Sequence, residues 1–513
     1  MESIENYKFE KRFETIMKIY KKAFLILICI VLSGVGAYPQ HNIDEAVKLI
    51  SSDELMKTVE VLASEGFAGR LSGSPGYNMA ADYIKKEFQK LQLKPAFDDG
   101  YYQFLNVEYN EIMPGYKFGF INQTGNKREY KLGKDFVFRG FTGSGNFTAE
   151  AVFCGYGISQ PEIGYNDYEN IDVKDKVVIV FKGNPGWRID TLQWNEGFPR
   201  QKANIAASYG AKGILFVSSP ANKNPQAVIG SVFHGAGEQN VDFPQLHIEI
   251  DAADELLSGT GFTLKDLQLK IDSLKKPYPV RTNSIVELNV NAKYEKEKGT
   301  MNIAALLEGF HPELKNEYII IAAHLDHVGS QAGEIYFPGA NDNASGSAAV
   351  LEIARAFSNS GIKPARSIIF ALLASEEQGL HGAEFLASNP PIPVENITAM
   401  INLDCVGYGD SIQVGNGKSS PLLWEIAKRC DSKTTKFMVE RTWSGGGADA
   451  TPFHNKGIPS LYFVTTNSYE HLHKTTDLPA TLNKKLFEKL TQLAFLTLIE
   501  VSGEKYIKEE IQK

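Results

Sequence analysis

Short apolar runs alternate with segments of helical periodicity in the C-terminal half of the chain. The runs are typical of buried strands and cover residues 302–307, 318–323, 367–373, 399–403 and 460–464. Apolar residues at three-to-four spacing predict helices at residues 345–359, 382–388, 420–430 and 483–501. Strands separated by helices favour a mostly parallel sheet that helices cover on both faces.

The earlier parts of the chain have a different pattern. Residues 53–62 and 77–93 carry the spacing of amphipathic helices. Between residues 101 and 290 this spacing largely vanishes, and short β-type runs with turn residues replace it. The expected elements of this region are strands at 149–153, 176–181 and 214–217 and one helix at 200–209.

These patterns predict an α/β fold with a mixed, mostly parallel sheet flanked by helices and interrupted by an inserted β-rich region. A chain of 513 residues is too long for one simple core, so two domains are expected. The predicted α/β domain comprises residues 38–105 and 296–505. The insert comprises residues 106–295, and residues 506–513 form a C-terminal tail.

The N-terminus has the order of a secretory signal peptide. Lys18, Lys21 and Lys22 precede the apolar run 23–32, and small residues follow at 33–37. The apolar run is too short to cross a bilayer comfortably. We therefore expect residues 1–37 to be a signal peptide cleaved after Ala37, with Met17 as an alternative start and an uncleaved anchor as the rival interpretation. The mature protein would be exported (secreted, periplasmic or at the cell surface) with no stable membrane insertion.

Composition argues against nucleic-acid binding and against a fold built on a disulfide framework. The formal net charge of −8 gives no electrostatic footprint for nucleic acid. Once Cys29 has left with the signal peptide, the remaining cysteines are Cys154, Cys405 and Cys430, an odd number without metal-ligand spacing. We expect three buried thiols, with a single disulfide as the alternative.

Histidines and carboxylates follow the ends of the predicted strands. Parallel α/β sheets place their binding sites beyond the carboxyl ends of their strands, so these side chains are expected to converge. The candidates are His324, Asp326, Asp342, Glu376, Glu377, Asp404, His471 and His473. We expect His327 and His381 to be packing or pocket-wall residues.

This set of donors indicates a pair of zinc ions. Zinc binds His, Asp and Glu where no thiolate is offered. Two such ions would acidify a shared water and polarise a peptide carbonyl. Glu376 is placed to move the proton to the leaving amine, and Asp326 could accept the second ring N–H of His324 and fix its tautomer.

Five segments resemble the motifs of metallopeptidase family twenty-eight. They are His324-Leu325-Asp326, the glycine-rich turn around Asp342, Glu376-Glu377, Asn402-Leu403-Asp404, and His473 followed four residues later by Asp477. The resemblance implies a zinc exopeptidase fold and two zinc ions per chain. It places Asp342 as the bridge, His324 and Asp404 on one ion, and Glu377 and His473 on the other. It also implies Glu376 as the base and Asp326 as the supporting acid.

The insert also carries a resemblance. Residues 155–158, 165–168 and 172–178 resemble a protease-associated domain, with a core at about 145–275. Two positions depart from the peptidase pattern. Leu472 replaces a Tyr that helps to hold the oxyanion in some relatives, and Asp449 is all that remains of a Ser-Asp-His motif.

The predicted function is that of an exported zinc-dependent exopeptidase acting on peptides, with an aminopeptidase preferred. The alternatives are a carboxypeptidase or dipeptidase on the same scaffold, a single-zinc glutaminyl cyclase, and a non-catalytic receptor-like binding protein. Carboxylates that cap a free amine would favour the first function, and a cluster of Arg, for which Arg441 is one candidate, would favour a carboxypeptidase. The sequence does not specify the oligomeric state.

Overall fold

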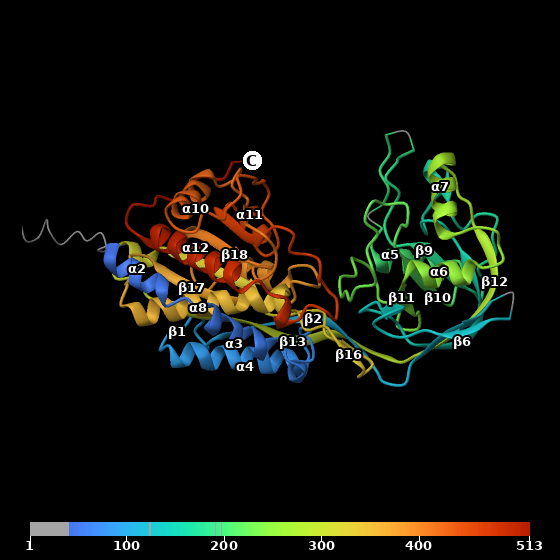
Figure 1. Cartoon of the computed structure of the whole chain (residues 1–513), viewed down its shortest axis with the longest axis horizontal. Coiled ribbons are helices and arrows are strands. Elements are labelled where there is room, and N and C mark those ends of the chain that lie inside the picture. The colour runs from blue at the N-terminus through green and yellow to red at the C-terminus, as the bar shows by residue number, and fades with distance from the viewer. Residues whose placement is uncertain (1–39, 123–124, 190, 196, 513) are drawn as a thin grey trace, which may run out of the picture.

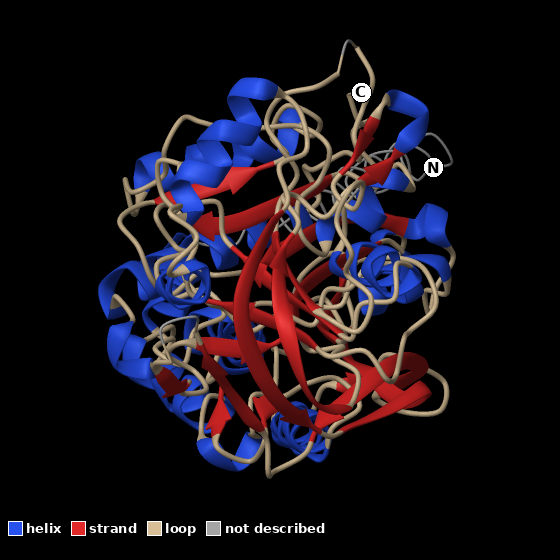
Figure 2. Ribbon diagram, turned by 90° about the vertical axis from the view of Figure 1, so that its right-hand side faces the viewer, coloured by secondary structure: helices blue, strands red, loops and turns tan. Residues whose placement is uncertain are grey.

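The computed structural model of the chain describes residues 40–122, 125–189, 191–195 and 197–512. The signal peptide expected at residues 1–37 lies outside these residues. Two bodies share the described chain, an α/β domain and a β-rich insert, and long strands run between them (Figure 1). Viewed from the side, helices lie around the outside of the strands (Figure 2).

The α/β domain is built on an eight-stranded sheet with the order β1-β13-β17-β14-β18-β20-β19, in which β2 also pairs with β13. The strands β17, β14, β18 and β20 are parallel neighbours. The remaining pairs are antiparallel. The bounds are β1 Lys94–Pro95, β2 Tyr102–Ile112, β13 Ala292–Leu307, β14 Tyr318–His324, β17 Ser367–Leu373, β18 Ile397–Leu403, β19 Ile412–Gly415 and β20 Ser460–Thr465.

The central parallel strands are buried along nearly their whole length. Their continuous apolar runs are explained by this burial on both faces. One face packs against α2, α3, α4, α8, α10 and α12, and the other packs against α9 and α11. These helices are α2 Gln40–Lys48, α3 Ser52–Leu62, α4 Pro75–Lys90, α8 Gly346–Ser360, α9 His381–Ser388, α10 Pro421–Lys433, α11 Ala450–Asn455 and α12 Lys484–Ser502. The α/β class predicted from the sequence is confirmed.

The insert contains a second eight-stranded sheet, with the order β4-β3-β12-β6-β9-β10-β11-β5. Its strands are β3 Lys117–Ile121, β4 Lys127–Glu129, β5 Phe136–Phe138, β6 Gly145–Phe153, β9 Val177–Phe181, β10 Gly213–Val217, β11 Gln245–Ile248 and β12 Val280–Val290. Two short strand pairs are separate from both large sheets. In the insert, β7 Ser159–Gln160 pairs with β8 Tyr165–Asn166, and in the α/β domain β15 Ser330–Gln331 pairs with β16 Ile335–Tyr336.

The insert holds more helix than the sequence pattern suggests. The predicted helix is α5 Pro199–Ser208, but α6 Ile250–Leu257 and α7 Leu264–Leu274 are also present, so the expectation of one helix was wrong. A capping box between Thr263 and Asp266 begins α7. Both helices bury apolar residues against the insert's sheet.

The two bodies are joined by β2 and β13, which pair from Tyr102 opposite Ile303 to Ile112 opposite Ala292. The predicted domain boundaries at 105/106 and 295/296 therefore fall inside continuous strands. At the C-terminus, Tyr506 is buried and its carbonyl accepts a hydrogen bond from Arg366, so the predicted tail packs against the α/β domain. Within the described residues, no helix combines the length and apolar character needed to cross a membrane.

Candidate metal centre

The predicted ligands converge at one edge of the large sheet. His324 is the last residue of β14 and lies in register with Leu373 at the end of β17. Glu377 follows β17 and Asp404 follows β18. Because the three strands are parallel neighbours, the residues that follow them meet at the carboxyl edge of the sheet.

Asp342 lies between two groups of donors. Its Oδ1 is 3.3 Å from Nε2 of His324, which is itself 3.4 Å from Oδ1 of Asp404. Its Oδ2 is 3.0 Å from Nε2 of His473, which is 2.9 Å from Oε2 of Glu377. Each group brings its ligand atoms within 4.8 Å of one another. The structure thus brings all five predicted ligands together, with Asp342 shared between the two groups.

The turn that carries Asp342 is held by two residues whose roles the sequence analysis did not identify. The main-chain N–H groups of Asn341 and Asp342 donate to the carboxylate of Asp477 at 2.9 and 3.1 Å. The buried guanidinium of Arg70 donates to the carbonyls of Pro338 and Gly339 at 2.7 and 3.0 Å. These contacts fix the backbone that leads into the shared carboxylate.

The concentration of carboxylates in the cluster favours the binding of cations. Burial opposes the charged form of His324 and His473, but the surrounding carboxylates raise the pKa of both imidazoles well above its usual value. Nε2 of His324 and Oδ1 of Asp404 are buried without a hydrogen-bond partner. Two histidines and three carboxylates in this arrangement fit a pair of divalent metal ions, since they are donors that zinc accepts.

Glu376 and Glu377 are adjacent carboxyls in opposite environments. Burial would raise the pKa of Glu377, but His473 and His327 lower it to about 2. Burial raises the pKa of Glu376 well above its usual value, and the charges of Glu377 and Asp449 add to this rise. Neighbouring carboxyls whose pKa values are driven apart are typical of a site that divides ligand and acid–base roles.

Asp326 supports the site differently from the expectation. Its carboxylate accepts hydrogen bonds from the main-chain N–H groups of Glu376 and Glu377 at 3.1 and 3.4 Å. Nδ1 of His324 lies 3.1 Å from the main-chain oxygen of Asp326 but 3.7 Å from its carboxylate. The main-chain oxygen, and not the carboxylate as expected, therefore accepts the second ring N–H of His324.

His327 lies inside the site, although the sequence pattern suggested packing or a pocket wall. Its ring is fully buried, and Nδ1 is 2.7 Å from Oε1 of Glu377 and 3.9 Å from Oδ2 of Asp342. The available signal was its position three residues beyond His324, in the segment that leaves the same strand.

The choice between the two late histidines agrees with the geometry. Nδ1 of His471 lies 3.0 Å from the hydroxyl of Thr476, away from the shared carboxylate, whereas His473 contacts Asp342. A tyrosine hydroxyl is also present at the site, although Leu472 replaces the Tyr of some relatives. It belongs to Tyr462, which donates to Oδ2 of Asp404 at 3.3 Å. Tyr462 lies within an apolar strand, where no local pattern marks it as functional.

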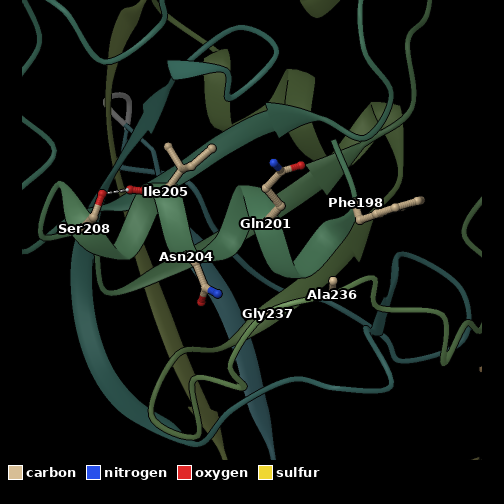
Figure 3. A pocket seen from close by; sticks show the side chains of 7 residues that line it. All are labelled: Phe198, Gln201, Asn204, Ile205, Ser208, Ala236 and Gly237. Carbon is tan, nitrogen blue, oxygen red and sulfur yellow. Dashed lines mark hydrogen bonds between the residues drawn. The ribbon is translucent and has the colours of Figure 1, made fainter. Parts of the chain in front are cut away.

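Among the surface pockets that lie outside the ligand cluster, two differ clearly in their lining residues. One of about 560 Å³ is formed by Gln413, Arg441, Trp443 and residues 464–470. The other, of about 390 Å³, lies on α5 in the insert, where Asn204 points toward the segment of Ala236 and Gly237 (Figure 3). The lining of this second pocket contains no His or carboxylate, so it does not offer metal ligands.

The three cysteines in the described part of the chain are buried, and none of them forms a disulfide. Burial raises the pKa of the Cys154, Cys405 and Cys430 thiols. Low-pKa, accessible thiols are the reactive ones, so these side chains have the properties of inert core residues.

Comparisons with known proteins agree with this architecture. Residues 302–498 match the family model described as "Peptidase family M28". An aminopeptidase of Pseudomonas aeruginosa is 26% identical over 367 residues, which cover 71% of this chain and 59% of that protein. Transferrin receptor protein 2 of Mus musculus is 24% identical over 436 residues, covering 71% of this chain and 51% of the receptor. The chain thus spans between half and two thirds of the length of these relatives.

Solved structures share the fold across nearly the whole chain. An aminopeptidase from Aneurinibacillus sp. strain AM-1 superposes with a TM-score of 0.63 at 20% identity, covering 92% of this chain and 99% of that one. A zinc aminopeptidase from Bacillus subtilis gives a TM-score of 0.60 at 18% identity, covering 90% and 98%.

Both donor groups lie within residues 302–498, the segment that matches the family model. This segment is thus similar to peptidase family M28, and the solved aminopeptidase structures share its fold.

Proposed function

We propose that the protein is a zinc-dependent exopeptidase that acts as an aminopeptidase on peptides. The observation that carries the proposal is the shared position of Asp342, with one carboxylate oxygen toward each of two groups of donors. The match of residues 302–498 to the family M28 model and the similarity to proteins named as aminopeptidases support it.

In this proposal one zinc ion is held by His324 and Asp404, the other by Glu377 and His473, and Asp342 binds both. When bound, the ions supply an acidified water and polarise the peptide carbonyl. Glu376 acts as general base, because burial and the charges of Glu377 and Asp449 raise its pKa, and a raised pKa helps a carboxyl to hold and return the transferred proton. The hydroxyl of Tyr462 donates to Oδ2 of Asp404 and so helps to orient this proposed ligand.

The charge around the site supports an aminopeptidase over a carboxypeptidase. Asp449 is fully buried, neither of its carboxylate oxygens has a hydrogen-bond partner, and burial together with the nearby Asp404 and Asp326 raises its pKa to about 8. A substrate's free ammonium group is compatible with such surroundings, whereas a free carboxylate would be repelled. Arg441 is the single basic residue of the pocket it lines, and its guanidinium donates to Gln413 at 3.0 Å.

We also propose that the protein is exported. The support is the basic, apolar and small-residue order of residues 18–37. A fusion of residues 1–45 to a reporter that is active only outside the cytoplasm would test this proposal, and cytoplasmic retention of the reporter would contradict it.

The test of the enzymatic proposal combines metal analysis with a substrate panel. We expect about two zinc ions per chain and hydrolysis of aminoacyl chromogenic substrates that a chelator abolishes and zinc restores. Hydrolysis confined to substrates with a free C-terminus would favour the carboxypeptidase. A chain that binds no zinc after reconstitution and cleaves neither kind of substrate would overturn the proposal in favour of a binding protein.

A further inference from the structure

A loop of the insert reaches the metal-ligand cluster of the α/β domain. Residues 222–227 of this loop are exposed, but residues 228–230 are buried. Val228 and Val232 pack in one apolar cluster with Val328 and Phe337, which belong to the α/β domain. The loop is therefore anchored on the segments that lead from His327 and toward Asp342.

Gly230 of this loop makes two hydrogen bonds to a single predicted ligand. Its main-chain N–H donates to the main-chain oxygen of His473 at 2.9 Å. Its carbonyl oxygen lies 3.1 Å from Nδ1 of the His473 ring. His473 has a φ of 55°, which a residue with a side chain keeps only where the surrounding contacts hold it. Gly230 thus restrains both the backbone and the ring of His473.

The second contact specifies the tautomer of the ring. A carbonyl oxygen only accepts hydrogen bonds, so Nδ1 of His473 must carry the proton. In the neutral ring that would bind a metal, Nε2 then has the free lone pair, and this atom lies 3.0 and 2.9 Å from Asp342 and Glu377. A second partner that orients a metal-ligating imidazole typically changes metal affinity by about 10- to 100-fold when it is lost.

Only glycine fits at this position. A Cβ at residue 230 would lie 2.8 Å from Cζ of Phe337 and 2.9 Å from Cγ2 of Val328, and both side chains are buried. Contacts this short force the loop or its neighbours to move. A movement of the loop would carry the carbonyl of Gly230 away from His473.

We propose that Gly230 is a positioning residue for the metal centre, and that the insert completes this centre by fixing the orientation of His473. The proposal rests on the metal-dependent function proposed above and assigns the insert a role in it. It predicts that one of the two zinc sites depends on the insert, whereas the site of His324 and Asp404 does not.

The test is zinc titration of the metal-free full chain with Gly230→Ala. We expect the variant to bind one zinc as the wild type does and the second about 10- to 100-fold more weakly. Gly186→Ala is the matched control, because it lies in the insert with open space around its Cβ and without a positive φ. Two ions bound with wild-type affinity by Gly230→Ala would overturn this inference alone. A wild-type chain that binds no zinc would overturn the proposed function with it.

A second measurement uses the wild-type protein and does not depend on how the variant folds. In the zinc-loaded chain labelled with ¹⁵N-histidine, we expect the His473 ring to be protonated at Nδ1 and unprotonated at Nε2. The signal is assigned by its loss in His473→Asn. A ring protonated at Nε2 and bound through Nδ1 would contradict the role given to Gly230.

Discussion

Two adjacent glutamates illustrate how environment separates chemical roles between residues of the same type. Glu377 is surrounded by histidines and stays ionised, whereas Glu376 is surrounded by carboxyls and holds its proton more tightly. In the proposed mechanism the first binds metal and the second moves protons.

Glu376→Gln is the direct test of this division of roles. The amide keeps the shape of the side chain but cannot accept the proton, so we expect both zinc ions to remain and turnover to fall by about 10²- to 10⁴-fold. Metal analysis and initial rates measure the two effects, with the exposed Glu384→Gln as control. Wild-type turnover in Glu376→Gln would exclude this residue as the base.

Asp342→Ala addresses the shared carboxylate. This variant removes the oxygens that face both donor groups, so we expect it to lose zinc as well as activity. Zinc content after dialysis, compared with that of the exposed Asp98→Ala, provides the measurement. Retention of two tightly bound ions would show that Asp342 does not bridge them.

The five candidate ligands could be predicted from the sequence because each one follows a buried strand or lies in a glycine-rich turn. It did not reveal the contacts of Arg70 or His327. Arg70 lies in a loop more than 250 positions before the carbonyls that it holds, and no local pattern encodes such a contact. His327 carried a local signal, but a histidine beyond a strand end is also compatible with packing.

Among the elements, α8 packs directly behind the site and buries a carboxyl. Glu352 is 2% exposed, and one of its oxygens accepts a hydrogen bond from Arg355 at 2.8 Å while the other has no partner. Burial raises the pKa of Glu352 from 4.5 to about 7. The folded protein therefore holds a proton that the unfolded chain has already released.

This burial predicts a pH dependence of stability. Since the folded state binds more protons between pH 4.5 and about 7, the contribution of Glu352 to the free energy of unfolding falls as the pH rises through that range. We expect Glu352→Gln to resemble the wild type in urea denaturation at pH 4.5 and to be more stable than the wild type at pH 8. The exposed Glu60→Gln is the control, and a difference that does not change with pH would contradict the assignment.

The buried strands of the large sheet were predictable because both of their faces are apolar. The strand β13 was recognised only from residue 302 onward, since residues 295–298 are all charged and carry no apolar pattern. They lie on a partly exposed ladder, where pairing with β2 stabilises the strand in place of burial. Short helices such as α6 were not predicted, because eight residues contain few repeats of the helical period.

At the scale of the whole molecule, an ion pair with a buried arginine connects the insert to β2, a strand of the α/β sheet. Arg200 of α5 is 2% exposed and donates to Glu108 of β2, which also accepts from the hydroxyl of Tyr294 at 3.0 Å. The main-chain oxygen of Glu108 accepts from Gln378, the residue after Glu377, at 2.6 Å. The insert is thus coupled to the turn that carries the proposed base.

Arg200→Met should weaken this coupling. The change removes the cation from Glu108, whose side chain is 26% exposed and keeps its hydrogen bond from Tyr294. We therefore expect a loss of about 1 to 3 kcal/mol and a separation of the thermal unfolding of the two bodies in calorimetry. The exposed Arg281→Met serves as the control. A single transition at the wild-type temperature would show that the ion pair does not couple the two bodies.

The ladder between β2 and β13 also determines where the protein can be shortened. Ile112 and Ala292 are opposite one another on this ladder, so the ends left by excising residues 113–291 already lie side by side. A tight turn of two residues could close them into a hairpin. Excision at 105/106 and 295/296 would instead cut β2 and β13 within their ladder. The strand ends left behind would have unpaired main-chain groups, which favour aggregation.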